Sequence, residues 1–105
     1  MHPIDLRNET WHTLRGRVNG ERAAVLGAMR RHAGLSRTVR DWAELLEMDH
    51  LSVAPRITDL VQLGFVVLDG RHGKRGLYRA LFDREARAAF EQAAARARDP
   101  QLSLL

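Results

Sequence analysis

Cationic side chains and glycines gather in one short stretch of this 105-residue chain. Between residues 70 and 79 there is no carboxylate, and glycines separate the cations; these are Arg71, Lys74, Arg75 and Arg79, with His72 among them. Arginine and lysine bind phosphate groups through charge-assisted hydrogen bonds, and glycine permits the positive φ angles of a tight turn. The stretch therefore predicts a loop that contacts phosphate groups.

Glycine-rich basic loops also bind nucleotides, but two features argue against that alternative here. No helical pattern follows the loop directly, and no Gly-Lys-Ser/Thr sequence closes it. The apolar runs Phe65–Leu68 and Leu77–Leu81 predict two strands instead. We therefore expect a β-hairpin whose loop is Asp69–Gly76.

Two helical patterns precede this hairpin. Thr38 is a suitable N-cap for a first helix, which is followed by a turn at Met48–His50. We expect the second helix to begin at Ser52, because Pro55 then falls in the first turn, where its missing N–H is not needed. A longer helix that tolerates Pro55 is the alternative. Gly64 is expected to end the helix.

Apolar stripes on both helices predict their buried faces. Trp42 shares a face with Val39, Ala43 and Leu46, so we expect it in the core rather than as a stacking platform for bases. The second stripe consists of Val53, Ile57, Leu60 and Val61. The opposite side of that helix carries Ser52, Pro55, Thr58, Asp59 and Gln62, with Arg56 on the flank.

Further helices are predicted on either side of this region. A short one spans Glu9–Arg15, with Trp11 and Leu14 inward, and Leu35-Ser36 is expected to pair with the hairpin. The pattern of residues 21–32 predicts a helix with Val25, Leu26, Met29 and Ala33 in the core, and with Arg22, Arg30 and Arg31 towards solvent.

An alanine-rich helix is predicted after the hairpin, over Arg84–Arg98 with Asp83 as its N-cap. Its narrow apolar seam consists of Phe82, Ala86, Ala89, Phe90, Ala93 and Ala97. Small residues on a seam allow close helix approach. This helix could therefore pack on the helix of residues 21–32, or pair with a second copy in a homodimer.

The composition limits the classes of protein to which this chain could belong. Cysteine is absent, the net charge is +4, and the histidines lack metal-ligand spacing. No apolar run reaches the roughly 18 residues of a membrane span, and the N-terminus lacks a signal-peptide core. We expect a non-enzymatic protein without metal or cofactor, in the cytoplasm, at the nucleoid or in a phage-infected cell.

The segments Leu35–Leu46 and Ser52–Leu60 resemble the second and third helices of winged helix-turn-helix proteins. Glu9-Thr-Trp11 resembles the lead-in of small winged-helix proteins of phages and prophages. The resemblance implies binding to double-stranded DNA, the third helix in the major groove and the hairpin, or wing, on phosphates or the minor groove. The expected contacts are Thr38, His50, Ser52, Pro55, Arg56, Thr58, Arg71, His72, Lys74, Arg75 and Arg79.

The expected fold is therefore α+β, mainly helical with one small hairpin. We divide the chain into an N-terminal arm with a short helix (1–16), a winged helix-turn-helix domain (17–82), a C-terminal helix (83–98) and a tail (99–105). In that tail, Gln101-Leu102-Ser103-Leu104-Leu105 resembles the peptide by which bacterial polymerases and repair proteins bind the sliding clamp. The alternative is a frayed end.

These features support three hypotheses, of which the first is a DNA-binding adaptor that recruits the replication clamp through its tail. The second is a dimeric transcriptional regulator, or repressor, paired through Arg84–Arg98. The third is a winged helix that binds an acidic protein instead of DNA.

Overall fold

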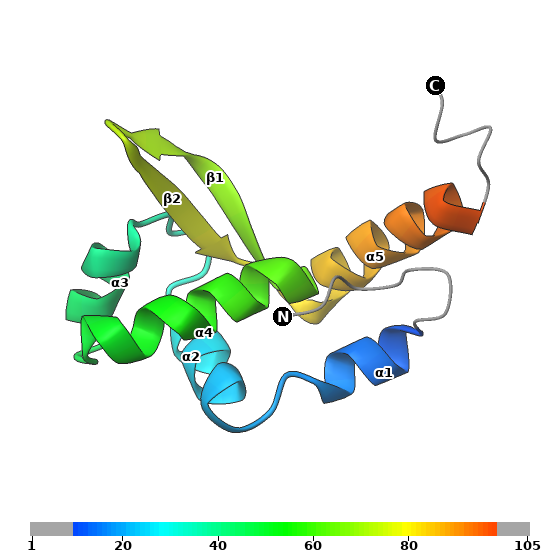
Figure 1. Cartoon of the computed structure of the whole chain (residues 1–105), viewed down its shortest axis with the longest axis horizontal. Helices are drawn as coiled ribbons and strands as arrows, with labels where there is room; N and C mark the ends of the chain where they lie inside the picture. Colours follow the sequence, from blue (N-terminus) through cyan, green and yellow to red (C-terminus); the bar gives the residue numbers. More distant parts are fainter. Residues whose placement is uncertain (1–9, 99–105) are drawn as a thin grey trace.

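The computed structural model describes residues 10–98, which form five helices and one two-stranded antiparallel sheet (Figure 1). The order is α1 (Trp11–Gly16), α2 (Gly20–Arg30), α3 (Val39–Leu45), α4 (His50–Leu63), β1 (Val66–His72), β2 (Arg75–Ala80) and α5 (Asp83–Arg98). This order confirms the predicted α+β class. The hairpin and α5 extend away from a body formed by α2, α3 and α4 (Figure 1).

The core lies between α2, α3, α4 and the base of the hairpin. Its largest fully buried side chains include Trp42 and Phe65. The position of Trp42 confirms the prediction from its helical stripe, and its indole Nε1 donates a hydrogen bond to the Tyr78 carbonyl at 2.8 Å. Helix α3 is therefore attached to β2 by a partly buried hydrogen bond as well as by packing.

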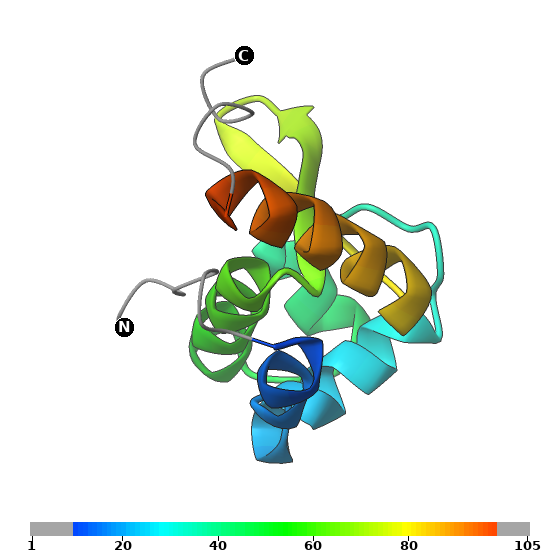
Figure 2. The same ribbon diagram turned by 90° about the vertical axis from the view of Figure 1, so that its right-hand side faces the viewer.

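Trp11 connects the two ends of the described chain. Its ring centroid lies 5.3 Å from that of Phe65 and 6.1 Å from that of Phe90 on α5. In Figure 2, α1 and α2 lie below α4, and α5 crosses above it. Helix α5 thus packs on α1, and its contact with α2 is at its first turn, where Asp83 pairs with Arg30.

The hairpin is longer than the sequence predicted. Asp69–Gly76 was expected to be a loop, but strand pairing continues to His72 and Arg75, and only Gly73 and Lys74 form the turn. Gly73 has a φ of +62°, and a two-residue hairpin turn favours glycine at such a position. The register shifts between Leu68 and Arg71, so the ladder is irregular in the middle of β1.

The predicted start of the second helix was wrong, and the alternative was right. Helix α4 begins at His50, with Asp49 in the N-cap position, so Pro55 lies inside the helix. Proline removes the N–H that would bond the Leu51 carbonyl. Leu51 and Pro55 are both exposed, so water can bond the Leu51 carbonyl in place of the missing N–H. Gly64 ends α4 with a φ of +87°, as predicted.

Several flanking predictions also need correction. Ala33 is exposed, Arg22 and Arg30 are half-buried in ion pairs, and Arg37 rather than Leu35-Ser36 bridges to the hairpin at Tyr78. On α5, Asp83 is the first helical residue instead of the N-cap. Phe82 and Ala89 are exposed, whereas Ala94 is buried. For Arg22 and Arg30 the reason is tertiary, because they pair with Asp59 and Asp83 of other elements.

Candidate nucleic-acid interface

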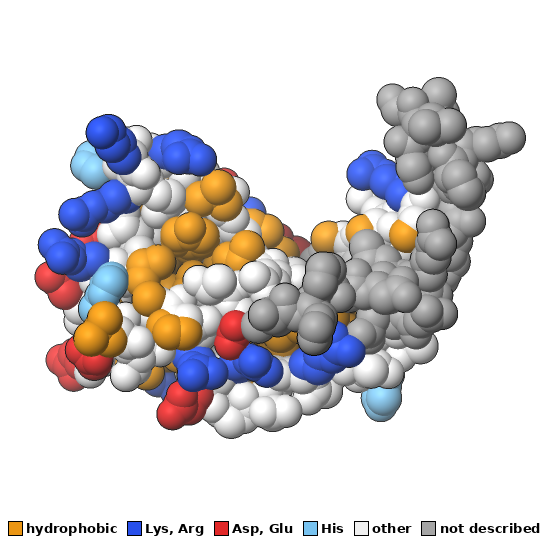
Figure 3. Space-filling view, in the orientation of Figure 1, with side chains coloured by type: hydrophobic (Ala, Val, Ile, Leu, Met, Phe, Trp, Pro, Cys, Tyr) orange, Lys and Arg blue, Asp and Glu red, His pale blue; other side chains and the backbone are white. Residues whose placement is uncertain are grey.

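Three cations and one histidine surround the tip of the hairpin. Arg71, His72, Lys74 and Arg75 are all exposed. Among the described residues none of these four side chains has an ion-pair partner. Figure 3 shows lysine and arginine gathered at the outer end of the hairpin. Unpaired cations on a projecting strand pair are free to contact an external anion.

A pocket of about 350 Å³ continues this basic surface towards the helices. Its basic residues come from three elements, with Arg40 on α3, His50 on α4 and Arg75 on β2. No carboxylate lines it. The N-terminus of α4 lies at this pocket, since His50 is its first residue, and the Asp49 side chain makes no cap hydrogen bond there. Cations and free N–H groups together suit a phosphate group.

Thr38 also lines this pocket, but its side chain serves the helix. The residue is 5% exposed, and its Oγ1 accepts a hydrogen bond from the Asp41 backbone N–H at 3.1 Å. The predicted N-cap is therefore confirmed. A ligand in the pocket could therefore contact only the small part of Thr38 that is exposed.

The outer face of α4 carries few polar groups. Leu51, Ser52, Pro55 and Thr58 are exposed there, and Leu51 is 79% exposed. The Thr58 hydroxyl donates a hydrogen bond to the Ala54 carbonyl at 3.0 Å. The N-terminal half of the helix thus presents mostly hydrocarbon, with Ser52 as its one exposed hydroxyl that has no hydrogen bond within residues 10–98.

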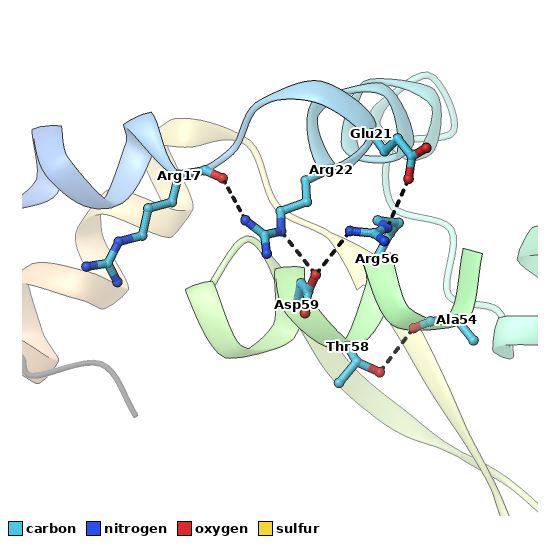
Figure 4. A network of polar contacts seen from close by, with 7 residues as sticks. All are labelled: Arg17, Glu21, Arg22, Ala54, Arg56, Thr58 and Asp59. Carbon is cyan, nitrogen blue, oxygen red and sulfur yellow. Dashed lines mark hydrogen bonds and ion pairs between the residues drawn. The ribbon is translucent and has the colours of Figure 1, made fainter. Parts of the chain in front are cut away.

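Arg56 lies between α4 and α2 (Figure 4). Its Nε is 3.2 Å from Glu21 Oε2, and its Nη1 is 3.6 Å from Asp59 Oδ2. Asp59 also accepts a hydrogen bond from Arg22 Nε at 3.0 Å, and its side chain is 13% exposed. Asp59 therefore faces the body, contrary to its predicted place on the outer side. A contact between Arg56 and guanine would require these ion pairs to open.

Arg79 likewise pairs within the protein. Its Nε lies 3.2 Å from Asp69 Oδ2, and its Nη1 lies 3.7 Å from Glu85 Oε2 on α5. Asp69 also accepts a 2.6 Å hydrogen bond from the Ser36 hydroxyl. The Ser36 hydrogen bond and then Arg79 lower the pKa of Asp69. Arg79 thus connects the base of the hairpin to α5.

Arg37 and Arg40 were not among the contacts predicted from the sequence. Both are exposed, and neither side chain forms an ion pair in the part of the chain that the structure describes. They flank the N-cap Thr38, and a helix N-terminus is where phosphates bind. Their position beside an N-cap could have identified them as phosphate contacts from the sequence. The approach of Arg40 to Arg75 could not have been predicted, because it depends on the tertiary fold.

Residues 10–98 show neither a metal site nor a membrane-spanning helix. Within that range no three histidine, cysteine or acidic side chains could together hold a metal ion. None of the described helices is long and apolar enough to cross a bilayer.

Comparison with known proteins yields matches in structure only. No protein-family model and no curated protein sequence matches this chain. The homodimeric winged helix-turn-helix DNA-binding domain of a possible ArsR-family transcriptional regulator from Mycobacterium bovis aligns with a TM-score of 0.55 at 22% identity. The alignment covers 85% of this chain and 80% of that domain.

A second structure is the PcaV transcriptional regulator from Streptomyces coelicolor, solved with its natural ligand. It aligns with a TM-score of 0.48 at 22% identity, over 100% of this chain and 86% of that one. The first alignment, together with the order of helices and hairpin, shows that this protein has the winged helix-turn-helix fold. The hairpin β1–β2 is its wing.

Proposed function

We propose that this protein is a transcriptional regulator that binds duplex DNA, with α4 in the major groove and the wing on the adjacent backbone. The observation that carries the proposal is the continuous basic surface from the wing tip to the pocket at the start of α4. Its basic residues are Arg40, His50, Arg71, His72, Lys74 and Arg75. They make no ion pairs with described carboxylates, so phosphate contacts would not have to displace internal partners.

The shape of the helical pair supports the same role. Helix α3 packs across α4 and leaves the outer face of α4 exposed, and a major groove about 12 Å wide admits one helix. Ser52 and Thr58 lie on that face, and the pocket beside it can hold a backbone phosphate. The structural match from Mycobacterium bovis is described as a DNA-binding domain. Regulation at the nucleoid follows from this role.

We further propose that the protein acts as a homodimer paired through α5. An apolar cavity of about 280 Å³ lies between the body and α5, lined by Leu14, Leu63, Phe90, Ala93 and neighbouring residues. Ala89 on the same surface is exposed, so a second copy could approach closely. The domain from Mycobacterium bovis is itself described as homodimeric.

The adaptor hypothesis rests on Gln101–Leu105, which lie outside the described residues. The match from Mycobacterium bovis is described as the DNA-binding domain of a possible transcriptional regulator, which favours the regulator over the adaptor. Recruitment of the sliding clamp and a phage or prophage origin therefore stay predictions from sequence.

Selection of bound duplexes from a random pool, combined with sedimentation, tests the proposal. We expect a pseudo-palindromic site with half-sites about one helical turn apart, bound by a dimer. Ala93→Glu should weaken the dimer, whereas Ala95→Glu, an exposed position on the same helix, should not. Failure to enrich any duplex at low salt would favour the protein-binding winged helix. A monomer on an asymmetric site would contradict the dimer.

A further inference from the structure

Leu51 is the most exposed large apolar side chain among the described residues, and it lies on α4, the helix that would enter the groove. Leu51 is 79% exposed, compared with 49% for Leu68 and 47% for Phe82. Pro55 follows four residues later and Thr58 seven residues later, so the three side chains share one face of α4. Leu51 and Pro55 form an apolar ridge on this face, and in the proposed complex with DNA the ridge would lie in the groove.

The groups that usually read bases by hydrogen bonding are scarce on this ridge. Arg56 is held by Glu21 and Asp59, and the Thr58 hydroxyl bonds the helix backbone. Gln62 is exposed but lies about three turns from Leu51, a rise of roughly 16 Å. His50 faces the basic pocket with Arg40 and Arg75, which suits a phosphate. Ser52 is therefore the polar side chain that remains beside Leu51 and Pro55 to bond a base.

We infer that α4 reads the C5-methyl groups of thymine, with Leu51 and Pro55 as the specificity-determining contacts. The inference rests on the proposed DNA binding and names the feature of the DNA that is read. In the major groove, thymine is the base that presents a methyl group, and apolar side chains contact it. The cations of the pocket and wing flank the ridge, so a polyanion is favoured over an apolar peptide as the occupant.

The test uses the duplex that the full-length protein selects from a random pool. Each thymine is replaced in turn by uracil, which lacks only the methyl group, and binding is followed by fluorescence anisotropy. We expect one or two positions in each half-site where uracil raises Kd about fourfold, the effect of exposing one buried methyl group. Elsewhere in the site uracil should have no effect.

The protein side of the test uses Leu51→Ala, which keeps a good helix former at an exposed position and should fold. On this variant the uracil effect at the sensitive positions should fall to less than twofold. Leu45→Ala removes a 42% exposed leucine from α3 and should keep the full effect. Thermal melting checks that both variants fold.

The outcomes separate this inference from the proposed function. Equal affinity for thymine and uracil at every position would overturn methyl recognition and leave DNA binding intact. A full uracil effect on Leu51→Ala would overturn the role of Leu51. Failure to select any duplex would overturn both, and the apolar ridge would then be assigned to a protein partner.

Discussion

Arg56 Nη1 lies 3.6 Å from Asp59 Oδ2, so the one arginine of α4 faces a carboxylate of its own helix rather than solvent. With Arg22 on the same carboxylate, the pair attaches α4 to α2. The helix that would enter the groove is thus oriented by charges on its inner flank. Its outer flank is left with small polar and apolar side chains.

Removal of Asp59 should destabilise the fold. The side chain is 13% exposed, and Asp59→Ala would leave Arg22 and Arg56 without their shared counter-ion. We expect a loss of about 1–2 kcal/mol in the free energy of unfolding, measured by urea denaturation. Glu91→Ala is the control, because the Arg87–Glu91 pair is exposed on both sides and should contribute less than about 0.5 kcal/mol. Equal losses of stability in the two variants would contradict the role of Asp59 in attaching α4 to α2.

Glu47 should be a stabilising site for glycine. It has a φ of +55° just after α3, where the Met48 N–H bonds the Ala43 carbonyl at 2.9 Å. Residues with side chains adopt this conformation at a cost, and glycine is preferred there. Glu47→Gly should raise the free energy of unfolding by about 0.5–1 kcal/mol. Glu44→Gly, inside α3, should lower it by about 1 kcal/mol. The same sign for both variants would exclude this explanation.

Acid should weaken the attachment of α5 to the body. Burial alone would raise the pKa of Asp83, but hydrogen bonds from Arg30 and Arg15 outweigh it and lower the pKa below its ordinary value. A carboxyl with a lowered pKa stabilises the fold fully above its unfolded pKa, roughly 3.9, and loses that contribution as pH falls through the folded value.

The stability difference between wild type and Asp83→Asn should therefore be largest above about pH 5 and shrink below about pH 4. Urea denaturation across this range measures it. A difference that is constant between about pH 3 and pH 7 would show that ionised Asp83 does not stabilise the fold.

The tail prediction is tested by binding to a purified bacterial sliding clamp. If Gln101–Leu105 form a clamp peptide, the full-length protein should bind, and Gln101→Ala with Leu104→Ala should abolish binding. Calorimetry or anisotropy at tens of micromolar would detect the weak affinity typical of short peptides. No binding at that concentration would remove the adaptor hypothesis.

Local patterns predicted much of the fold. The cap at Thr38, the end at Gly64 and the burial of Trp42 follow from residue type and helical spacing, which act over a few residues. The start of α4 could not be predicted in this way, because packing of Val53 and Ile57 stabilises a helix that propensity alone would interrupt at Pro55.

The candidate site was predictable only in part. The basic wing was apparent from the sequence, because its cations are neighbours along the chain. The pairs Arg56–Glu21 and Arg79–Glu85 were not, since each joins residues of two different elements. The pocket of Arg40, His50 and Arg75 also depends on segments that only folding brings together.

The central claim is that the basic surface binds the DNA backbone, and the salt dependence of duplex binding tests it most directly. Log K should fall linearly with log salt concentration, and Lys74→Gln with Arg75→Gln should reduce the slope by about two units for each bound subunit, roughly 0.9 for each lost phosphate contact. Arg84→Gln with Arg87→Gln removes the same charge from exposed positions on α5 and should leave the slope unchanged. An unchanged slope in the wing variant, or no binding at low salt, would contradict the account.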